Sequence, residues 1–175
     1  MARDRGRRRA RYLCRTGARR IPESSTTAPA VGRLVVGPRV SILGVGLDLI
    51  DLARAERLLQ RKGQQAVRRL LTEAEYRSIQ NRTPFAQHFA SRLAAKEAVY
   101  KALQCLPGAR AIGWRDIEVE RGEDGRPSVR LHGTAARVLA IQPLARIHLA
   151  LSHSALTAGA VAVLEARPAH QDTPA

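Results

Sequence analysis

The spacing of hydrophobic residues changes along the chain and predicts helices in its first half and strands in its second. Residues Ile42–Ile50 are rich in leucine and β-branched residues, which is typical of a buried strand. Apolar residues then recur at intervals of three and four, which predicts a helix from Leu52 to about Arg61 with Asp51 as its N-cap. The folded region is therefore expected to begin with a strand followed at once by an amphipathic helix.

Two further helices are predicted from their N-terminal signals. Thr72 followed three residues later by Glu75 fits a capping box, so a helix should run from there to about Gln80. Thr83 and Pro84 should begin the longest helix, which extends to about Gln104. Proline suits the first helical position because the N–H that it lacks would have no partner there.

The second half of the chain alternates apolar and polar residues with the period of two that strands have. Strands are expected around Ile117–Val119, Val129–Leu131, Ile147–Leu151 and Ala158–Leu164, with a turn at Glu123–Arg126 and a short helix at Thr134–Ala140. No internal repeat is visible. The order β-α-α-α-β-β-α-β-β indicates an α+β fold with a mostly antiparallel sheet and helices segregated from it.

The basic charge of the chain is concentrated at its N-terminus. Of the formal net charge of +15, residues 1–20 carry +8 and residues 21–40 carry +1, which leaves +6 for residues 41–175. Residues 1–40 join an arginine-rich arm to a polar linker and cannot bury enough surface to fold, so we expect a disordered extension. Three interpretations of the arm stay open: it binds nucleic-acid phosphates, it is a transit peptide, or it is upstream sequence with little function.

The remaining composition fits one folded domain, expected at residues 41–167 and followed by a flexible tail at 168–175. A chain of 175 residues is ordinary for a single domain with its own core. No apolar run reaches the roughly 18 residues of a membrane span. Cys14 and Cys105 form neither a disulfide framework nor a zinc-site spacing, so a reducing, cytoplasmic setting is expected.

The longest predicted helix carries the first candidate site residues. On a wheel of about 100° per residue, Lys96 falls within about 20° of Phe85 in the apolar arc, and Glu97 and Lys101 lie at its border. A lysine in an apolar stripe usually snorkels, and a Glu–Lys pair four residues apart usually supports the helix surface. However, the chain contains 27 arginines and only three lysines, two of which are Lys96 and Lys101. In so arginine-rich a chain, a lysine is expected to mark a site that needs a compact positive charge.

Asp48 is the second unusual residue, because it lies near the end of an otherwise apolar strand. Asp51 is better placed to cap the following helix, and Leu49 stands where a dinucleotide-binding fingerprint needs its third glycine. Together with Glu97, Asp48 could hold a hard cation through two carboxylates. Ser152 and His153 follow the strand expected to end at Leu151, and because successive strand side chains point to opposite faces, the pair is not expected to form a catalytic dyad by itself.

Taken in order, these segments resemble the holo-acyl-carrier-protein synthase family over about residues 41–165. The segments that carry the resemblance are Gly44–Asp48, Leu71–Glu75, Phe89–Ala98 with Lys101, Asp116–Val119, Gly125–Pro127 and Leu151–His153. The block A-A-K-E-A-x-x-x-K with G-x-D upstream and S-H downstream is the specific part. The resemblance implies a 4′-phosphopantetheinyl transferase-like fold and a homotrimer with active sites at subunit interfaces.

The resemblance also implies an activity and assigns roles. The family moves 4′-phosphopantetheine from coenzyme A to a serine of apo acyl carrier protein, in fatty-acid biosynthesis or a related pathway, and releases 3′,5′-ADP. Asp48 and Glu97 resemble its Mg²⁺ ligands and, with Lys101, its catalytic residues. The implied coenzyme A-binding residues are Lys96, Lys101, Gly125, Arg126, Pro127, Ser152 and His153. The implied carrier-binding residues are Arg54, Arg57, Arg61 and Arg69.

Two alternative functions remain open at this point. One is a basic nucleic-acid-binding module formed by the arm and the arginine face of the first helix, but this leaves Asp48 and Glu97 unexplained and lacks aromatic residues for stacking. The other is an inactive trimeric relative that binds the carrier protein without modifying it.

Overall fold

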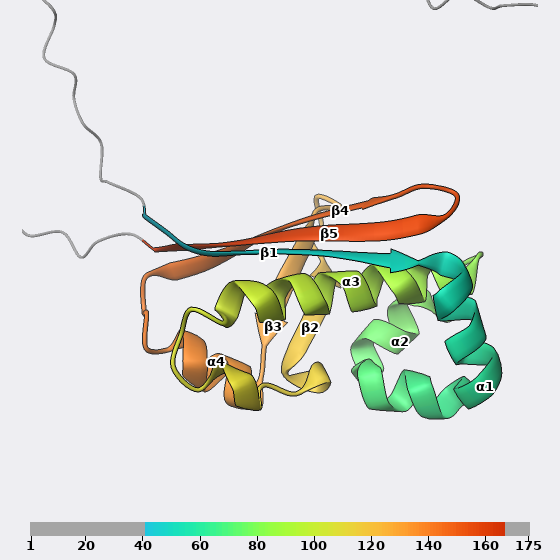
Figure 1. Ribbon diagram of the computed structural model, residues 1–175, viewed down its shortest axis with the longest axis horizontal. Helices are drawn as coiled ribbons and strands as arrows, with labels where there is room; N and C mark the ends of the chain where they lie inside the picture. Colours follow the sequence, from blue (N-terminus) through green and yellow to red (C-terminus); the bar gives the residue numbers. More distant parts are fainter. Residues whose placement is uncertain (1–40, 167–175) are drawn as a thin grey trace, which may run out of the picture. The chain divides into compact units, whose positions relative to one another are not determined.

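The computed structural model of the chain describes residues 41–166. In chain order its elements are β1 (Ser41–Asp51), α1 (Leu52–Leu70), α2 (Glu73–Ile79), α3 (Phe85–Leu103), η1 (Ala109–Ala111), η2 (Trp114–Asp116), β2 (Ile117–Arg121), β3 (Pro127–Leu131), α4 (Gly133–Leu139), β4 (Ala145–His153) and β5 (Thr157–Ala166). Apart from the short 3-10 helices η1 and η2, this is the predicted order, and the α+β fold class is confirmed (Figure 1). The predicted extension 1–40 and tail 168–175 lie outside the described residues.

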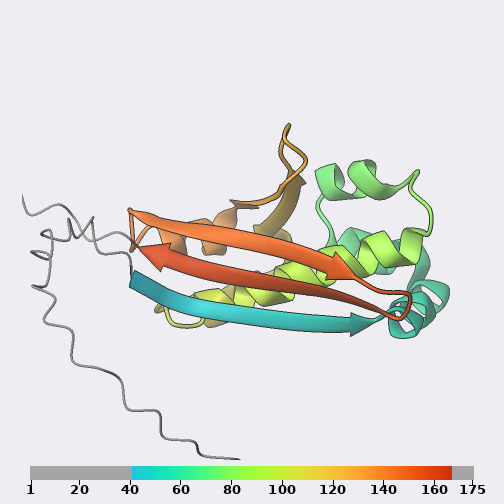
Figure 2. The same ribbon diagram turned by 90° about the horizontal axis from the view of Figure 1, so that it is seen from above.

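The strands of the described region pair only in antiparallel fashion, as predicted. β1, β5 and β4 form a three-stranded sheet in that order, and β2 pairs with β3 in a separate two-stranded sheet (Figure 2). The alternation that predicts these strands also decides which side is buried. In β5, Ala158, Ala160, Ala162 and Leu164 enter the core, while Val161 between them is exposed.

Helix α3 lies along one face of the three-stranded sheet (Figure 1). Gly46 makes this close approach possible, since a Cβ at that position would collide with the carbonyl oxygen of Ala98 in α3. Gly44 has the same relation to the carbonyl of Ala102. A side chain at either position would push the helix away, so the glycines allow β1 and α3 to touch backbone to backbone.

The core has two parts, and α3 belongs to both. Its C-terminal half packs with β2, β5 and α4 around residues such as Val99, Ile117 and Leu164. Its N-terminal half packs with α1 and α2 around Phe89 and Leu71. Within residues 41–166, no helix is both long and apolar enough to cross a membrane.

Two predicted helix boundaries are corrected by the structure. Helix α1 does not end near Arg61 but continues to Leu70, with a kink at Gly63, whose positive φ of 47° is readily adopted only by glycine. Helix α3 begins at Phe85, and Pro84 is its N-cap in an extended conformation rather than its first helical residue. The predicted capping box is confirmed, with Thr72 and Glu75 each accepting a hydrogen bond from the other's backbone N–H.

Candidate active site

Asp48 and Lys101 form an ion pair where β1 lies against α3. Lys101 Nζ is 2.8 Å from Asp48 Oδ1 and also donates a hydrogen bond of 3.0 Å to the carbonyl oxygen of Leu47. Asp48 comes two residues after Gly46 in the strand, so its side chain points to the same face, toward the helix. The Lys101 side chain is 43% exposed, and a pair this open to solvent contributes only about 0–1 kcal/mol to stability. The pair is therefore available for exchange with a ligand.

Glu97 lies near this ion pair and shares a cavity with Asp48. It lies one turn before Lys101 on α3, so the two side chains are neighbours on the helix surface. Glu97 and Asp48 both line a cavity of about 560 Å³. Two carboxylates at one cavity suit a hard divalent cation that completes its coordination with water and phosphate oxygens. Among the described residues, no group of three or more His, Cys, Asp or Glu side chains is placed to hold a metal ion.

Three of the four predicted carrier-binding arginines border the same cavity. Arg54, Arg57 and Arg61 line it together with the two carboxylates. The first turn of α1 that carries Arg54 is fixed by the N-cap, because the backbone N–H of Arg54 donates to Asp51 Oδ1 at 2.9 Å. Arg69 is exposed near the end of α1 and is not among the lining residues. The cavity is thus lined both by basic side chains of α1 and by the carboxylates of Asp48 and Glu97.

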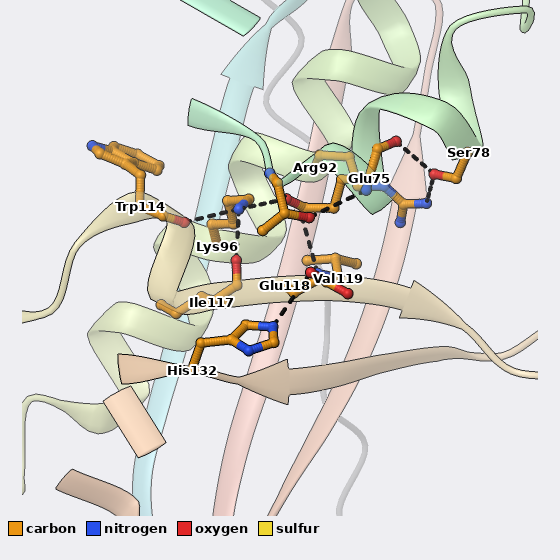
Figure 3. A network of polar contacts seen from close by, with 10 residues as sticks. Glu75, Ser78, Arg92, Lys96, Trp114, Ile117, Glu118, Val119 and His132 are labelled. Atoms are coloured by element: carbon orange, nitrogen blue, oxygen red, sulfur yellow. Dashed lines mark hydrogen bonds and ion pairs between the residues drawn. The ribbon is translucent and has the colours of Figure 1, made fainter. Parts of the chain in front are cut away.

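Lys96 has a different environment from the one expected of a phosphate ligand. Its side chain is fully buried, and Nζ donates to the carbonyl oxygens of Trp114 at 2.8 Å and Ile117 at 2.6 Å and pairs with Glu75 at 2.7 Å (Figure 3). These three partners use all three protons of the ammonium group. All three donors of Lys96 are therefore used within the chain, and its binding of coenzyme A stays a prediction.

The Lys96–Glu75 pair is costly to disturb from one side. Burial lowers the pKa of Lys96, and the adjacent Glu75 carboxylate opposes this shift. Glu75 is held in turn by the backbone N–H groups of Thr72 at 2.8 Å and Val119 at 3.0 Å. Removing one partner of such a buried pair strands the other charge and typically costs about 3–5 kcal/mol. Both residues are therefore part of the framework around the site.

A second cavity gathers most of the other predicted coenzyme A-binding residues. Gly125, Pro127, Ser152 and His153 line a cavity of about 320 Å³ at the ends of β3 and β4. Arg126 is not among its lining residues and instead lies 3.4 Å from Asp124 on the surface. These two cavities share no lining residue, so the predicted site residues form two separate groups within one chain.

The second cavity is also lined by arginine and histidine residues that sequence reasoning missed. These residues are Arg82, His88, Arg92 and Arg121. The pKa of His88 is lowered by burial and by the neighbouring positive charges of Arg82, His153 and Arg92, and burial also lowers the pKa of Arg92. Such a concentration of like charge favours an anionic ligand. Arg92 lies in the segment Phe89–Ala98, four residues before Lys96, and this position is the only sequence signal that could have indicated its role.

The chain has close relatives over the region that contains both cavities. Residues 44–169 match the model of the 4′-phosphopantetheinyl transferase superfamily. A relative from Paramagnetospirillum magneticum named holo-[acyl-carrier-protein] synthase is 42% identical over 134 residues, which cover 73% of this chain and 99% of the relative.

Solved structures give the same result. The crystal structure of holo-[acyl-carrier-protein] synthase from Neisseria meningitidis aligns with a TM-score of 0.64 at 30% identity and covers 71% of this chain and 98% of its own. A holo-(acyl-carrier-protein) synthase from Bacillus anthracis in complex with CoA (3′,5′-ADP) aligns with a TM-score of 0.57 at 31% identity, covering 71% of this chain and 97% of its own.

Proposed function

The chain belongs to the 4′-phosphopantetheinyl transferase superfamily, and we propose that it transfers 4′-phosphopantetheine from coenzyme A to a serine of an apo acyl carrier protein. The products are the holo carrier protein and 3′,5′-ADP. The observation that carries the proposal is that Asp48 and Glu97 line one cavity, with Lys101 paired to Asp48. The proposed setting is the cytoplasm, with a carrier protein of fatty-acid biosynthesis as the natural substrate.

The charges at this cavity suit the phosphoryl transfer. The serine oxygen forms a bond to the phosphorus that carries pantetheine, the bond from that phosphorus to the oxygen of 3′,5′-ADP breaks, and the serine proton passes to water. Asp48 and Glu97 would hold Mg²⁺, which neutralises charge on the pyrophosphate and helps activate the serine hydroxyl. Lys101 lies 2.8 Å from Asp48 and supplies a compact positive charge for a phosphate oxygen.

The second cavity is proposed to bind the nucleotide end of coenzyme A. Arg82, Arg92 and Arg121 offer guanidinium groups, which match phosphate oxygens in geometry and charge. Ser152 and His153 add further polar groups at the end of β4. This assignment gives the Ser–His segment a binding role, consistent with its side chains forming no dyad.

A homotrimer would bring the two groups of site residues together. The face of the sheet opposite α3 exposes a row of large apolar side chains, with Val45 60%, Leu47 55% and Leu49 66% exposed. Apolar surface of this kind often marks an interface. We assign this face to the contact between subunits, so that the Asp48 cavity of one subunit meets the Ser152 cavity of its neighbour.

The assembly is testable by light scattering coupled to size exclusion. The wild-type chain should have the mass of a trimer, and Leu47→Glu should give monomers because it places a charge in the apolar contact. Ile141→Glu is the matched control, since Ile141 is 54% exposed but follows α4 rather than lying on the sheet. A wild-type monomer, or a trimer that survives Leu47→Glu, would refute this face as the interface.

Arginines 54, 57 and 61 are proposed to dock the carrier protein. The carrier proteins that this family modifies are typically acidic around the modified serine, as the resemblance implies. The three arginines border the cavity that contains Asp48 and Glu97. Charge complementarity acts mainly on the encounter rate and is screened by salt. Docking at this mouth would deliver the serine hydroxyl to the proposed Mg²⁺ site.

The direct test mixes the purified chain with coenzyme A and an apo acyl carrier protein, with and without Mg²⁺. Mass spectrometry should show the carrier gaining one phosphopantetheine only when Mg²⁺ is present. Carrier binding without any mass gain would instead identify an inactive relative. If the chain bound nucleic acid but neither carrier nor coenzyme A, the proposed function would be wrong.

A further inference from the structure

The turn η2 is held in place by polar contacts rather than by packing. None of its residues, Trp114 to Asp116, is buried, and Trp114 is 40% exposed. A segment whose side chains do not enter the core depends on contacts of its backbone for a fixed position. Contacts that reach this backbone therefore control where the turn lies.

Lys96 supplies such contacts to the first residue of the turn and to the residue that follows the turn. Its ammonium group donates to the carbonyl oxygen of Trp114 at 2.8 Å and to that of Ile117 at 2.6 Å (Figure 3). The turn is also bound by its own Asp116, which accepts from Gly113, and by His132, whose N–H donates to the Asp116 carbonyl. Among these contacts, those of Lys96 are the ones that join the turn to α3.

Glu75 fixes the position of the ammonium group. It lies 2.7 Å from Lys96 Nζ, and its carboxylate oxygens also accept the N–H groups of Thr72 and Val119. The same carboxylate thereby joins α2, α3 and β2. A buried ammonium with three acceptors and a buried carboxylate with three donors form a satisfied network, which is rigid because any displacement leaves a charge unpaired.

The turn and the catalytic helix face each other across two cavities. Glu97, which follows Lys96 in α3, and Trp114 both line the cavity of about 560 Å³ that contains Asp48. The same two residues line a smaller cavity of about 190 Å³ next to it. The position of Trp114 relative to Glu97 therefore sets the boundary between the two cavities.

We propose that Lys96, with Glu75 as its buried counter-ion, is a positioning residue that holds the turn 114–116 opposite Glu97 and so fixes the width of the active-site cavity. The effect on the reaction rests on the proposed function. The effect on the turn does not, because it concerns the chain alone.

Trp114 is the chain's single tryptophan and reports directly on the turn. The test variant is Lys96→Met with Glu75→Gln, which removes both buried charges at similar volume and leaves neither unpaired. The matched control is Arg77→Met with Glu73→Gln. This is also an ion pair of α2, but its side chains are 70% and 65% exposed. Glu75→Asp, which keeps both charges but shortens the carboxylate side chain by one carbon, serves as a milder variant if the double variant does not fold by circular dichroism.

In the folded variant we expect the acrylamide quenching constant of Trp114 to rise at least twofold and its emission maximum to move to longer wavelength. We also expect kcat/KM for coenzyme A to fall at least tenfold, while the control pair changes neither quantity. Unchanged quenching in a folded variant would overturn the proposal, as would a freed Trp114 with kcat/KM within twofold of wild type. If wild type shows no transfer at all, the proposed function fails, and the quenching result alone decides whether Lys96 holds the turn.

Discussion

Replacing Gly46 by alanine should separate α3 from β1 and so misplace the catalytic residues. The new Cβ would lie 2.8 Å from the carbonyl carbon of Ala98 and 2.8 Å from the backbone nitrogen of Ala102, and closer still to the Ala98 oxygen. Carbon atoms in contact prefer about 3.5–4.0 Å, so the helix backbone has to move by roughly 1 Å. No flexible side chain can absorb this shift, because the colliding atoms belong to the main chain.

The cost follows from this displacement. Overpacking of a core contact typically costs about 1–3 kcal/mol, which corresponds to a fall in thermal midpoint of roughly 3–15 °C for a domain of this size. The 2.8 Å contact between Lys101 and Asp48 would lengthen as α3 moves. A misplacement of about 1 Å in an active site can reduce the rate about 100-fold. We therefore expect a large loss of kcat in a protein that still folds.

The assay combines thermal melting with carrier modification measured by mass spectrometry. Gly113→Ala is the control for stability, since a Cβ at Gly113 would have no neighbour closer than 3.7 Å and φ is negative there. Its thermal midpoint should stay at or above that of wild type. If Gly46→Ala had the thermal midpoint and the transfer rate of wild type, close contact between β1 and α3 would not be what positions the site.

Two further predictions concern the surface and the N-terminus. Arg54→Glu should raise KM for the carrier protein about tenfold or more at low salt and leave KM for coenzyme A nearly unchanged. The control Arg137→Glu on α4 should change neither KM. A carrier KM of Arg54→Glu equal to that of wild type would exclude this docking surface. Deleting residues 1–38 should leave transfer and the thermal midpoint nearly unchanged, because that composition cannot form a core, and a large loss of either would show that the arm binds or packs.

Local sequence signals predict most of the fold because each element carries its own pattern. The Thr72–Glu75 capping box identifies α2, and the alternation Ile147, Leu149, Leu151 identifies β4. Boundaries are less well determined where the signal is ambiguous. The predicted end of the first helix near Arg61 is two residues before Gly63, which instead forms a kink inside α1. A positive φ at one glycine bends the helix, and the helix continues after it.

The candidate site was predictable only in part, because several of its properties depend on distant residues. The charged residues Asp48, Glu97 and Lys101 stand out in sequence; Asp48 and Glu97 do line one cavity, and Lys101 pairs with Asp48. Lys96 stands out equally, yet its partners Glu75 and Trp114 lie 21 and 18 residues away in the chain, and only tertiary packing shows that it is buried and fully paired. An isolated wheel cannot distinguish a buried, paired lysine from one that snorkels to solvent.

The central claim is that Asp48 and Glu97 together support Mg²⁺-dependent transfer, and the rate of carrier modification in their alanine variants tests it most directly. The account predicts that wild type requires Mg²⁺. It also predicts that Asp48→Ala and Glu97→Ala each reduce kcat on the order of 1,000-fold, because several kcal/mol of charge stabilisation are lost. Both variants should keep the thermal midpoint of wild type within a few degrees. Transfer at the wild-type rate by either variant, at ordinary Mg²⁺ concentration, would contradict the account.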